Sequence, residues 1–280
     1  MKRKFSVLMC VYDKEESSNL DSSLHSIFDQ TIKPNQVVVV QDGPLRKELT
    51  DILDKYKIER IELKEKVGLT NGLNIGLTKC KYNLVARMDS DDICMKNRFE
   101  LLLREFSKDK KLVLAGGQII EFDNNGLRKK RIVPTNKKDI YNFSKKRNPF
   151  NHMSVMYRKD IILKLGGYPK EEYFEDYCLW TKVLGKGYNV KNISDIIIKA
   201  RSGNKHIKRR GGLKYIKHIY KFEKDLYNDG FINYIEFITN LSERIIISIL
   251  PNGLRKMIYS IFLRKWGGYY GFGYNNFTSL

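Results

Sequence analysis

The chain has few cysteines, and none of them forms a recognisable metal-binding or redox pattern. Its four cysteines stand alone at positions 10, 80, 94 and 178, without any Cys-x-x-Cys pair. Neither a zinc site nor a disulfide framework is therefore expected, and a reducing compartment fits this composition.

Several sequence signals that define large protein classes are also missing. No segment reaches the roughly 18 consecutive apolar residues of a transmembrane helix. Met1–Lys4 lead directly into a short apolar segment, so we expect no signal peptide. The glycines form neither GxGxxG nor GxxxxGK[ST], which argues against a dinucleotide-binding fingerprint and a P-loop.

Acidic residues are scarce relative to basic ones. The 280 residues include 52 Lys and Arg but only 32 Asp and Glu, which gives a net charge of +20. This excess indicates an anionic partner, such as nucleic acid, nucleotide phosphates or an anionic membrane. With 42% hydrophobic residues, the chain can form one large domain, or one domain with an appendage.

The first third of the sequence alternates between apolar runs and helical patterns. Phe5–Val11, Val37–Val40 and Leu84–Met88 are continuous apolar runs, as is typical of buried parallel strands. Between the first two, Leu20–Gln30 shows an apolar helical face, which we predict is capped by Asn19. This alternation predicts an α/β fold with a mostly parallel central sheet.

Polar residues follow each of these three strands. The strand ends lead into Tyr12-Asp13, Asp42-Gly43 and Asp89-Ser90-Asp91-Asp92. The carboxyl ends of parallel strands lie at one edge of a sheet, where such folds bind ligands. We therefore expect the aromatic ring and the carboxylates to converge there.

Two interpretations of the acidic segment remain open at this stage. Several carboxylates at a strand end suit a hard divalent cation such as Mg²⁺, which prefers oxygen ligands and substrate phosphates. Alternatively, Asp91 or Asp92 caps the helix that the pattern predicts within Lys96–Lys108, because carboxylates stabilise helix N-termini.

The remaining pattern predicts a less regular second part. Asn124-Asn125-Gly126 is a hairpin-type turn, and parallel pairing is expected to end there. The expected strands are Leu112–Phe122, Leu127–Val133, Ser154–Tyr157 and Val190–Ile198, and the expected helices are Arg98–Phe106, Arg158–Leu165 and a segment from Tyr173 to about Lys186.

Residues 199–280 have a different composition. They contain 15 Lys and Arg against 5 Asp and Glu. Ile245–Leu250 and Met257–Trp266 are apolar stretches flanked by basic residues. Either an amphipathic basic appendage or a helical cap on the sheet domain explains this pattern.

Five segments together resemble the inverting nucleotide-sugar glycosyltransferases of family 2, which have the GT-A fold. The resemblance covers roughly residues 4–200 and rests on Phe5–Tyr12, Val38–Gly43, Gly68–Leu77, Ala86–Asp92 and Phe174–Trp180. It implies a GT-A domain over residues 1–200, with a Rossmann-like sheet flanked by helices. Residues 201–280 would then be a basic, amphipathic helical region on the acceptor side or at the membrane.

The resemblance also implies roles for individual residues. Tyr12 would stack on the nucleobase, Asp42 would hydrogen-bond the base, and Cys10 would line the same nucleotide site. Asp89 would lie near the ribose and diphosphate, and Asp91, with Asp89, would bind Mn²⁺ or Mg²⁺. Asp92 would cap the following helix or orient its neighbours.

Further positions are implied on the acceptor side. Asp176 would be the general base, kept ionised by a helix N-terminus, and Glu175 would assist or orient it. His152 and Trp180 would line the acceptor site, and Arg209 and Arg210 would close over the diphosphate. For these two arginines, and for Arg201, solvated surface charge is the simpler alternative.

The expected function is therefore metal-dependent transfer of a sugar from a nucleotide sugar, most simply UDP-linked, with inversion to a β-linkage. The acceptor would be a saccharide on a polyprenyl diphosphate, as in O-antigen or capsule synthesis, at the cytoplasmic face of the inner membrane. A basic nucleic-acid-binding protein is an alternative, but no nucleic-acid motif is present and we expect no such partner. A metal-dependent nucleotidyltransferase would need a Gly-rich loop where Tyr12–Glu16 stands.

Overall fold

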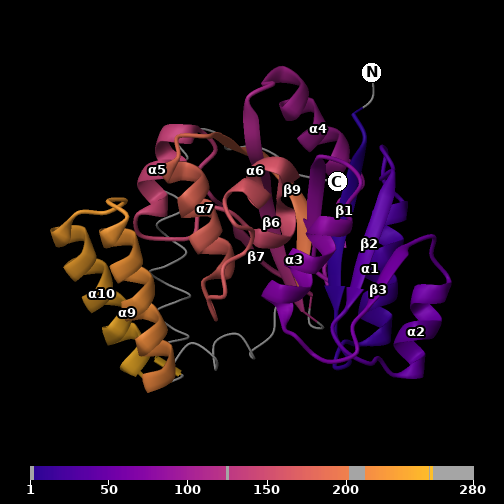
Figure 1. The fold of residues 1–280 in the computed structure, drawn as a ribbon, viewed down its shortest axis with the longest axis horizontal. Helices are drawn as coiled ribbons and strands as arrows, with labels where there is room; N and C mark the ends of the chain where they lie inside the picture. The colour runs from indigo at the N-terminus through magenta and orange to yellow at the C-terminus, as the bar shows by residue number, and fades with distance from the viewer. Residues whose placement is uncertain (1–2, 124–125, 202–211, 252, 255–280) are drawn as a thin grey trace.

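The computed structural model describes residues 3–123, 126–201, 212–251 and 253–254, which form one nine-stranded sheet with helices on both faces (Figure 1). The sheet order is β3-β2-β1-β4-β8-β6-β9-β5, and β7 pairs with β6 beside this path. The strands are β1 (Phe5–Val11), β2 (Gln36–Gln41), β3 (Glu59–Glu62), β4 (Leu84–Met88), β5 (Ile93–Cys94), β6 (Leu112–Asp123), β7 (Gly126–Arg131), β8 (Met156–Arg158) and β9 (Asn189–Arg201).

The first half of the sheet is parallel, as predicted. β1 lies between β2 and β4, and β3 extends the sheet beyond β2, with all three pairings parallel. The helix between β1 and β2, α1, covers Ser17–Phe28, so the predicted cap at Asn19 is wrong. The Glu16 carbonyl already accepts the backbone N–H groups of Asn19 and Leu20, and helical bonding is therefore under way before Asn19.

The second half of the sheet is mixed. β8 runs antiparallel to both β4 and β6, and β5 runs antiparallel to β9. β6 and β7 form the predicted antiparallel hairpin, with an irregularity between Glu121 and Phe122. Parallel pairing returns between β6 and β9, which differs from the prediction that it ends before the hairpin.

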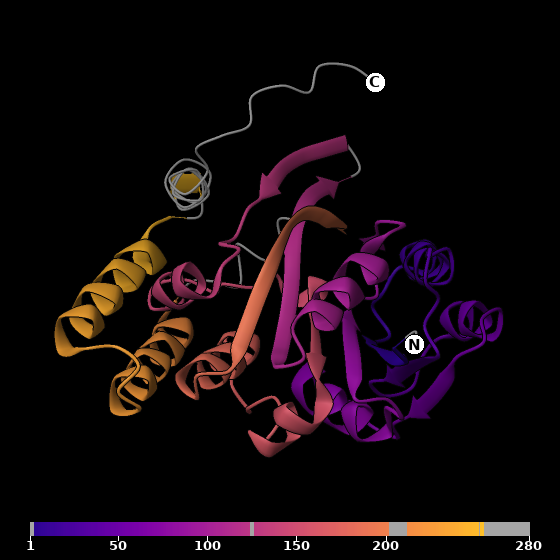
Figure 2. The ribbon, with the colours of Figure 1, turned by 90° about the horizontal axis from the view of Figure 1, so that it is seen from above.

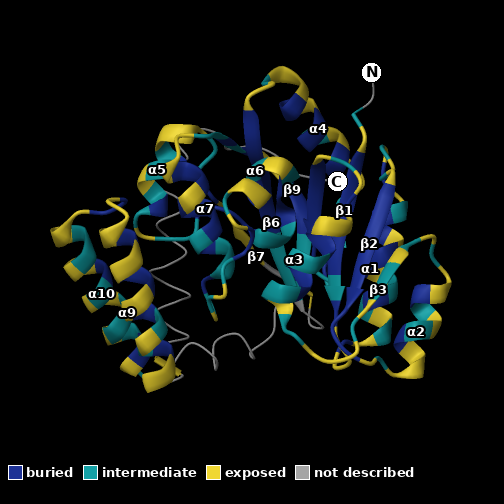
Figure 3. Cartoon of the chain, in the orientation of Figure 1, coloured by how far each residue is buried: buried dark blue, intermediate teal, exposed yellow. Residues whose placement is uncertain are grey.

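Two hydrophobic layers cover the faces of the sheet, whose strands are largely buried between them (Figure 3). On one face, α1, α2 (Lys47–Asp54) and α4 (Arg98–Lys108) pack against the strands. On the other face lie α3 (Leu69–Lys79), α6 (Lys159–Lys164) and α7 (Glu175–Gly185). Gly76 lets α3 approach closely, because a Cβ there would lie 2.4 Å from Leu8 Cδ1 and 2.7 Å from Val40 Cγ2.

The C-terminal helices α9 (Leu213–Asn228) and α10 (Tyr234–Ile249) lie beside α5 (Lys137–Ser144) and α7, far from β1–β3 (Figures 1 and 2). Tyr215, Ile219 and Phe222 of α9 are buried in the same hydrophobic cluster as α7. These contacts are those of a helical cap, whereas Met257–Trp266 lies outside the described residues. Within the described part of the chain, no helix is long and apolar enough to span a membrane.

Candidate active site

Three parallel strands end side by side at the predicted edge of the sheet. Val11 of β1 lies opposite Gln41 of β2, and Met9 lies opposite Met88 of β4, so the residues after these strands share one edge. The pKa of the Cys10 thiol reflects this convergence, because charged groups from the neighbouring strands act on it. Burial raises the pKa of its thiol to about 12, and the nearby charges of Arg87, Asp42 and Asp89 also act on it.

The two residues predicted to contact the nucleobase, Tyr12 and Asp42, differ in exposure. Tyr12 is exposed, and the Lys66 ammonium lies 5.5 Å from its ring centroid. Asp42 is buried, and its Oδ1 accepts the backbone N–H groups of Val67 (2.7 Å) and Gly68 (3.0 Å). Asp42 thus fixes the loop that opens α3, while its contact with a base stays a prediction.

Glu15 is a buried acid that the sequence pattern did not single out. Its Oε2 accepts the hydroxyl of Ser90 at 2.5 Å, which ties the loop after β1 to the acidic segment after β4. The Arg46 guanidinium donates to the Glu15 carbonyl from the other side. Glu15 sits in the charged run Asp13-Lys14-Glu15-Glu16, and nothing in that run distinguishes it as the buried member.

The acidic segment brings three carboxylates together. Oxygens of Asp89, Asp91 and Asp92 lie within 4.8 Å of one another. Burial, together with the charges of Asp89 and Glu15, raises the pKa of Asp91 to about 7. The fully buried Arg87 forms an ion pair with Asp89 and offsets part of this negative charge.

Asp92 does not cap the following helix, so that interpretation is wrong. β5 intervenes, and α4 begins after Asn97. Asp92 Oδ1 instead accepts the backbone N–H of Arg201 at 2.7 Å, and Arg201 Nε donates to the Asp91 carbonyl at 3.2 Å. The end of β9 therefore holds the acidic segment in place.

The carboxylate set fits a hard divalent cation. Asp92 is 2% exposed, and its Oδ2 has no hydrogen-bond partner among the residues that the structure describes. Burial, followed by the charges of Asp89 and Asp91, raises the pKa of Asp92 well above its ordinary value. Such crowding of like charges disfavours ionisation, and oxygen ligands of this kind suit Mg²⁺ or Mn²⁺.

Asp176 lies in the first turn of α7, where the side chain is held by two hydrogen bonds. Asn148 Nδ2 donates to Asp176 Oδ2 at 2.6 Å, and the Tyr177 N–H donates to Oδ1 at 2.7 Å. Burial raises the pKa of Asp176, and these hydrogen bonds oppose the shift. The helix N-terminus therefore acts in the expected direction but is outweighed by desolvation. Glu175 precedes it, half-buried.

His152 and Trp180 belong to a buried aromatic cluster. The rings of His152 and Trp180 have centroids 6.1 Å apart, and His152 Nε2 lies 3.2 Å from the Tyr168 hydroxyl. Burial lowers the pKa of His152 well below its ordinary value. Trp180 is fully buried, so it packs against His152 and does not present a surface to an acceptor.

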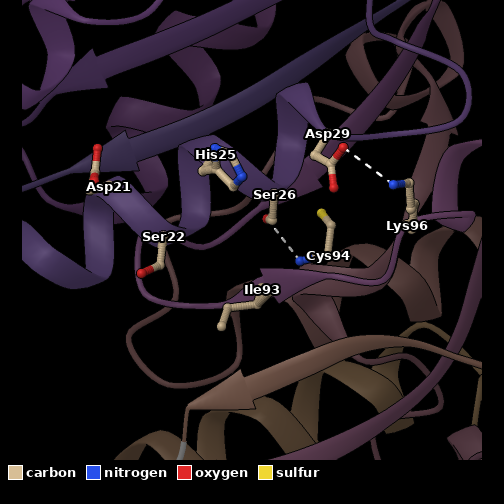
Figure 4. Close-up of a pocket in the computed structure, with 8 residues that line it drawn as sticks. All are labelled: Asp21, Ser22, His25, Ser26, Asp29, Ile93, Cys94 and Lys96. Atoms are coloured by element: carbon tan, nitrogen blue, oxygen red, sulfur yellow. Dashed lines mark hydrogen bonds and ion pairs between the residues drawn. The ribbon is translucent and has the colours of Figure 1, made fainter.

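Some predicted residues and one groove fall outside this site. Arg209 and Arg210 lie outside the described residues. A groove of about 410 Å³ lies between α1 and the segment after the acidic residues (Figure 4). Its lining includes His25 and Cys94 but none of the three clustered carboxylates, so we assign no substrate to it.

Sequence reasoning missed Arg87 and Asn148 as well as Glu15. Arg87 is a charged residue inside the apolar strand Leu84–Met88, which is a usable signal because buried charges are normally paired. Asn148 contacts Asp176 across 28 residues of sequence, and no local pattern indicates that contact.

Comparisons with known proteins match this chain to one family. The family described as "Glycosyl transferase family 2" matches residues 6–166. The chain is 37% identical over 271 residues to the Escherichia coli UDP-Gal:alpha-D-GlcNAc-diphosphoundecaprenol beta-1,3-galactosyltransferase, covering 94% of this chain and 98% of that relative.

Solved structures agree on the fold. Staphylococcus aureus TarS 1-349, crystallised in complex with UDP-GlcNAc, superposes with a TM-score of 0.65 at 17% identity, over 95% of this chain and 75% of that chain. Mannosyltransferase PcManGT from Pyrobaculum calidifontis, in complex with GDP-Man and Mn²⁺, gives 0.63 at 16% identity, over 97% and 77%. The expected GT-A fold is confirmed.

Proposed function

Because this chain belongs to glycosyl transferase family 2 and is a glycosyltransferase, we propose that it transfers a hexose from a UDP-linked donor to a lipid-linked saccharide. The acceptor we propose is a sugar on a polyprenyl diphosphate, as in O-antigen or capsule synthesis. The relative named for UDP-Gal and a diphosphoundecaprenol acceptor supports both halves of this proposal.

The observation that carries the proposal is the carboxylate cluster at the end of β4. Asp89, Asp91 and Asp92 gather beside the strand ends that bear Tyr12 and Asp42. Mn²⁺ or Mg²⁺ held by Asp91 and Asp89 would offset the charge that develops on a departing diphosphate. Arg87 holds Asp89 through an ion pair, and Arg201 holds the backbone of Asp91, so the cluster is preorganised.

Asp176 is proposed as the general base, with Glu175 assisting. Asn148 orients its carboxylate, which would take the proton of the acceptor hydroxyl as the sugar is attacked. One displacement with one base inverts the anomeric centre, so an α-linked donor gives a β-linkage. His152, which packs against Trp180 and is neutral, would line the acceptor side.

The two parts of the chain would share this work. We assign residues 1–200 to the transferase domain and residues 201–280 to a C-terminal region that serves the acceptor side and the membrane. A lipid-linked acceptor lies at a membrane surface, and we propose that the protein works at the cytoplasmic face of the inner membrane. Exposed isoleucines on α10 support this location, including Ile235 and Ile249.

A donor panel tests the proposal. The full chain is incubated with UDP-, GDP- and dTDP-hexoses, with a synthetic N-acetylhexosamine diphosphate lipid as acceptor, and with Mn²⁺, Mg²⁺ or EDTA. We expect transfer from one or more UDP-sugars with either metal and none with EDTA. Equal transfer in EDTA, or transfer from only non-uridine donors, would contradict the metal or the nucleotide assignment respectively.

A further inference from the structure

An ion pair between a fully buried glutamate and a half-buried arginine joins the two C-terminal helices beside α7. Glu223 of α9 is completely buried, and its Oε1 lies 2.7 Å from Arg244 Nε of α10. Asn240 Nδ2 donates to the other Glu223 oxygen at 3.2 Å. Burying a charged pair is costly unless its geometry is well satisfied, so this arrangement calls for an explanation beyond covering the core.

The Arg244 guanidinium contacts the residues that flank Asp176. It lies over the rings of Phe174 (5.8 Å), Tyr177 (5.7 Å) and Phe222 (5.6 Å), measured to the ring centroids. Phe174 and Phe222 are stacked, with centroids 4.6 Å apart and planes 6° apart. Phe174 precedes the first turn of α7 and Tyr177 follows Asp176, so the arginine packs against side chains on both sides of the carboxylate in the sequence.

The same helices also hold the segment that carries Asn148. Asn240 Nδ2 donates to the Lys145 carbonyl at 2.7 Å, and Arg244 Nη2 donates to the Lys146 carbonyl at 2.8 Å. The Tyr177 hydroxyl donates to the Ser144 carbonyl at 2.8 Å. Three successive carbonyls, of Ser144 to Lys146 at the end of α5, are therefore fixed shortly before Asn148.

Backbone strain at the start of α7 agrees with this role. Tyr173 has φ +78°, and it is the one non-glycine residue with positive φ in the described part of the chain. Such conformations persist where surrounding contacts enforce them. Tyr173 packs against Tyr215 and His218 of α9, with centroids 5.1 and 5.3 Å apart, so α9 supplies these contacts.

We propose that Arg244, paired with Glu223 and assisted by Asn240, is a positioning residue that fixes Asp176 and its partner Asn148 for proton abstraction. This inference rests on the proposed role of Asp176. The inference places α9 and α10 in the acceptor half of the active site, where they hold the proposed base in position. In this proposal Arg244 acts on the base indirectly, through Phe174, Tyr177 and the Lys146 carbonyl.

The charged surroundings of Asp176 define what a pH profile should report. Arg131 of β7 and Arg87 of β4 lower its pKa, as do the hydrogen bonds from Asn148 and the Tyr177 N–H, whereas burial raises it. Glu175 is its neighbour on α7. Loosening the Asn148 contact removes a stabiliser of the ionised form, so the acidic limb of activity should move to higher pH.

The test compares the double variant Glu223→Gln/Arg244→Met with Asn148→Ala and with their combination, in the full chain. Removing both charges avoids leaving one buried ion unpaired. We expect unchanged UDP binding, a kcat about 10- to 100-fold lower, as displaced catalytic geometry produces, and an acidic limb moved to higher pH as in Asn148→Ala. In the Asn148→Ala background the same change should lower kcat by a smaller factor than it does in the wild type, because part of its effect passes through the Asn148 contact.

Two further variants complete the test. Arg244→Lys keeps a charge beside Glu223 but loses the planar fork, so it should show a smaller shift in the same direction and decides the matter if the double variant does not fold. Lys217→Met removes an exposed cation from α9 and should behave as wild type.

Multiplicative losses in the Asn148→Ala background would overturn the inference, as would an unmoved acidic limb in a folded variant. Normal turnover of Asp176→Asn would overturn the base assignment itself. A low kcat of Asp176→Asn together with a wild-type kcat of the Glu223→Gln/Arg244→Met variant would overturn only the positioning role of Arg244.

Discussion

At the scale of single residues, burial and the hydrogen bond from Asn148 act in opposite directions on the pKa of the proposed base, Asp176. Burial raises the pKa of Asp176, while Asn148 and the Tyr177 N–H lower it. A carboxylate with a raised pKa accepts a proton more readily, but it must remain ionised at the working pH. Burial and the two hydrogen bonds therefore have opposite effects on the pKa that determines whether Asp176 can accept a proton.

Replacing Asp176 by Asn keeps the shape of the side chain and removes its basicity. We expect kcat to fall by about 10²–10⁴-fold, which is the usual contribution of general base catalysis. The Kd for UDP, measured by calorimetry with Mn²⁺ present, should stay near that of wild type. Loss of UDP binding would instead place Asp176 in the nucleotide site, and a normal kcat would move the base elsewhere, with Glu175 next.

The raised pKa of Asp91 predicts an unusual dependence of the protein's folding stability on pH. Its pKa is about 7 in the folded chain against an ordinary 3.8, so between these values the native state holds more protons than the unfolded state. Stability contributed by this group is then present at low pH and lost as pH rises towards 7. The metal-free protein should therefore melt at a lower temperature at pH 8 than at pH 5.

The control for this prediction is Asp91→Asn, which removes the group that titrates. Its melting temperature should fall less between the two pH values, although Asp92, whose pKa is also raised, leaves part of the slope. Mn²⁺ should raise the wild-type melting temperature most at pH 8, where the carboxylates are ionised. Identical slopes for wild type and variant would refute the assignment.

At the scale of elements, close packing of α3 on β1 and β2 positions the loop that Asp42 holds. Gly76 permits this approach, since an added Cβ would lie 2.4 Å from Leu8 Cδ1. The strand ends with Tyr12 and Asp42 and the loop before α3 thus form one rigid edge. The position of α3 therefore depends on the absence of a side chain at Gly76 as well as on apolar contacts.

Gly76→Ala should destabilise the protein even though Ala favours helix formation. Overpacking of this kind typically costs about 1–3 kcal/mol, to be measured by urea unfolding. Gly185 in α7 is the matched control, because a Cβ there would meet Phe231 Cδ2 at an ordinary 3.5 Å. Gly185→Ala should be neutral or stabilise by up to about 1 kcal/mol. Equal stability of Gly76→Ala and wild type would contradict the close approach.

Elements differ in how far the sequence alone predicts them. β1, β2 and β4 are runs of buried apolar residues, so their pattern and the acidic end of β4 are local properties. The helix α5 was not predicted, because its sequence KKDIYNFS buries only Ile140 and Ser144. Its apolar face is too narrow to give a helical signal.

Long-range contacts explain the remaining differences in the site. The capping interpretation of Asp92 failed because its partner is Arg201, 109 residues away. The contacts of Asn148 with Asp176 and of Arg244 with Lys146 likewise join distant segments. Spacing and composition carry no information about such pairs, so they emerge only from the folded chain.

At the scale of the whole molecule, we propose that the exposed side of α10 faces a membrane. Ile235, Ile246 and Ile249 are 73%, 62% and 68% exposed, and their spacing places them along one side of the helix. Residues 199–280 also carry half of the net charge of +20, as 15 basic against 5 acidic residues. Apolar anchors combined with cationic charge favour an anionic lipid interface.

Vesicle co-sedimentation measures this association. The protein should bind vesicles that contain anionic lipid at low salt and be released at high salt, because exposed charges are screened. Ile235→Ser/Ile246→Ser/Ile249→Ser should bind less, whereas Leu163→Ser, which alters an exposed apolar residue of α6, should bind as wild type. Equal binding to neutral vesicles, or no binding at all, would rule out the proposed surface.

The central claim is a single displacement assisted by Asp176 on one side and by the carboxylate cluster on the other. The anomeric configuration of the product tests it most directly. With an α-linked UDP-hexose that the donor panel identifies, and with the lipid diphosphate acceptor, the new linkage is read from the proton couplings of the purified product by NMR. We predict a β-linkage. An α-linkage would mean retention of configuration and would contradict the proposed mechanism.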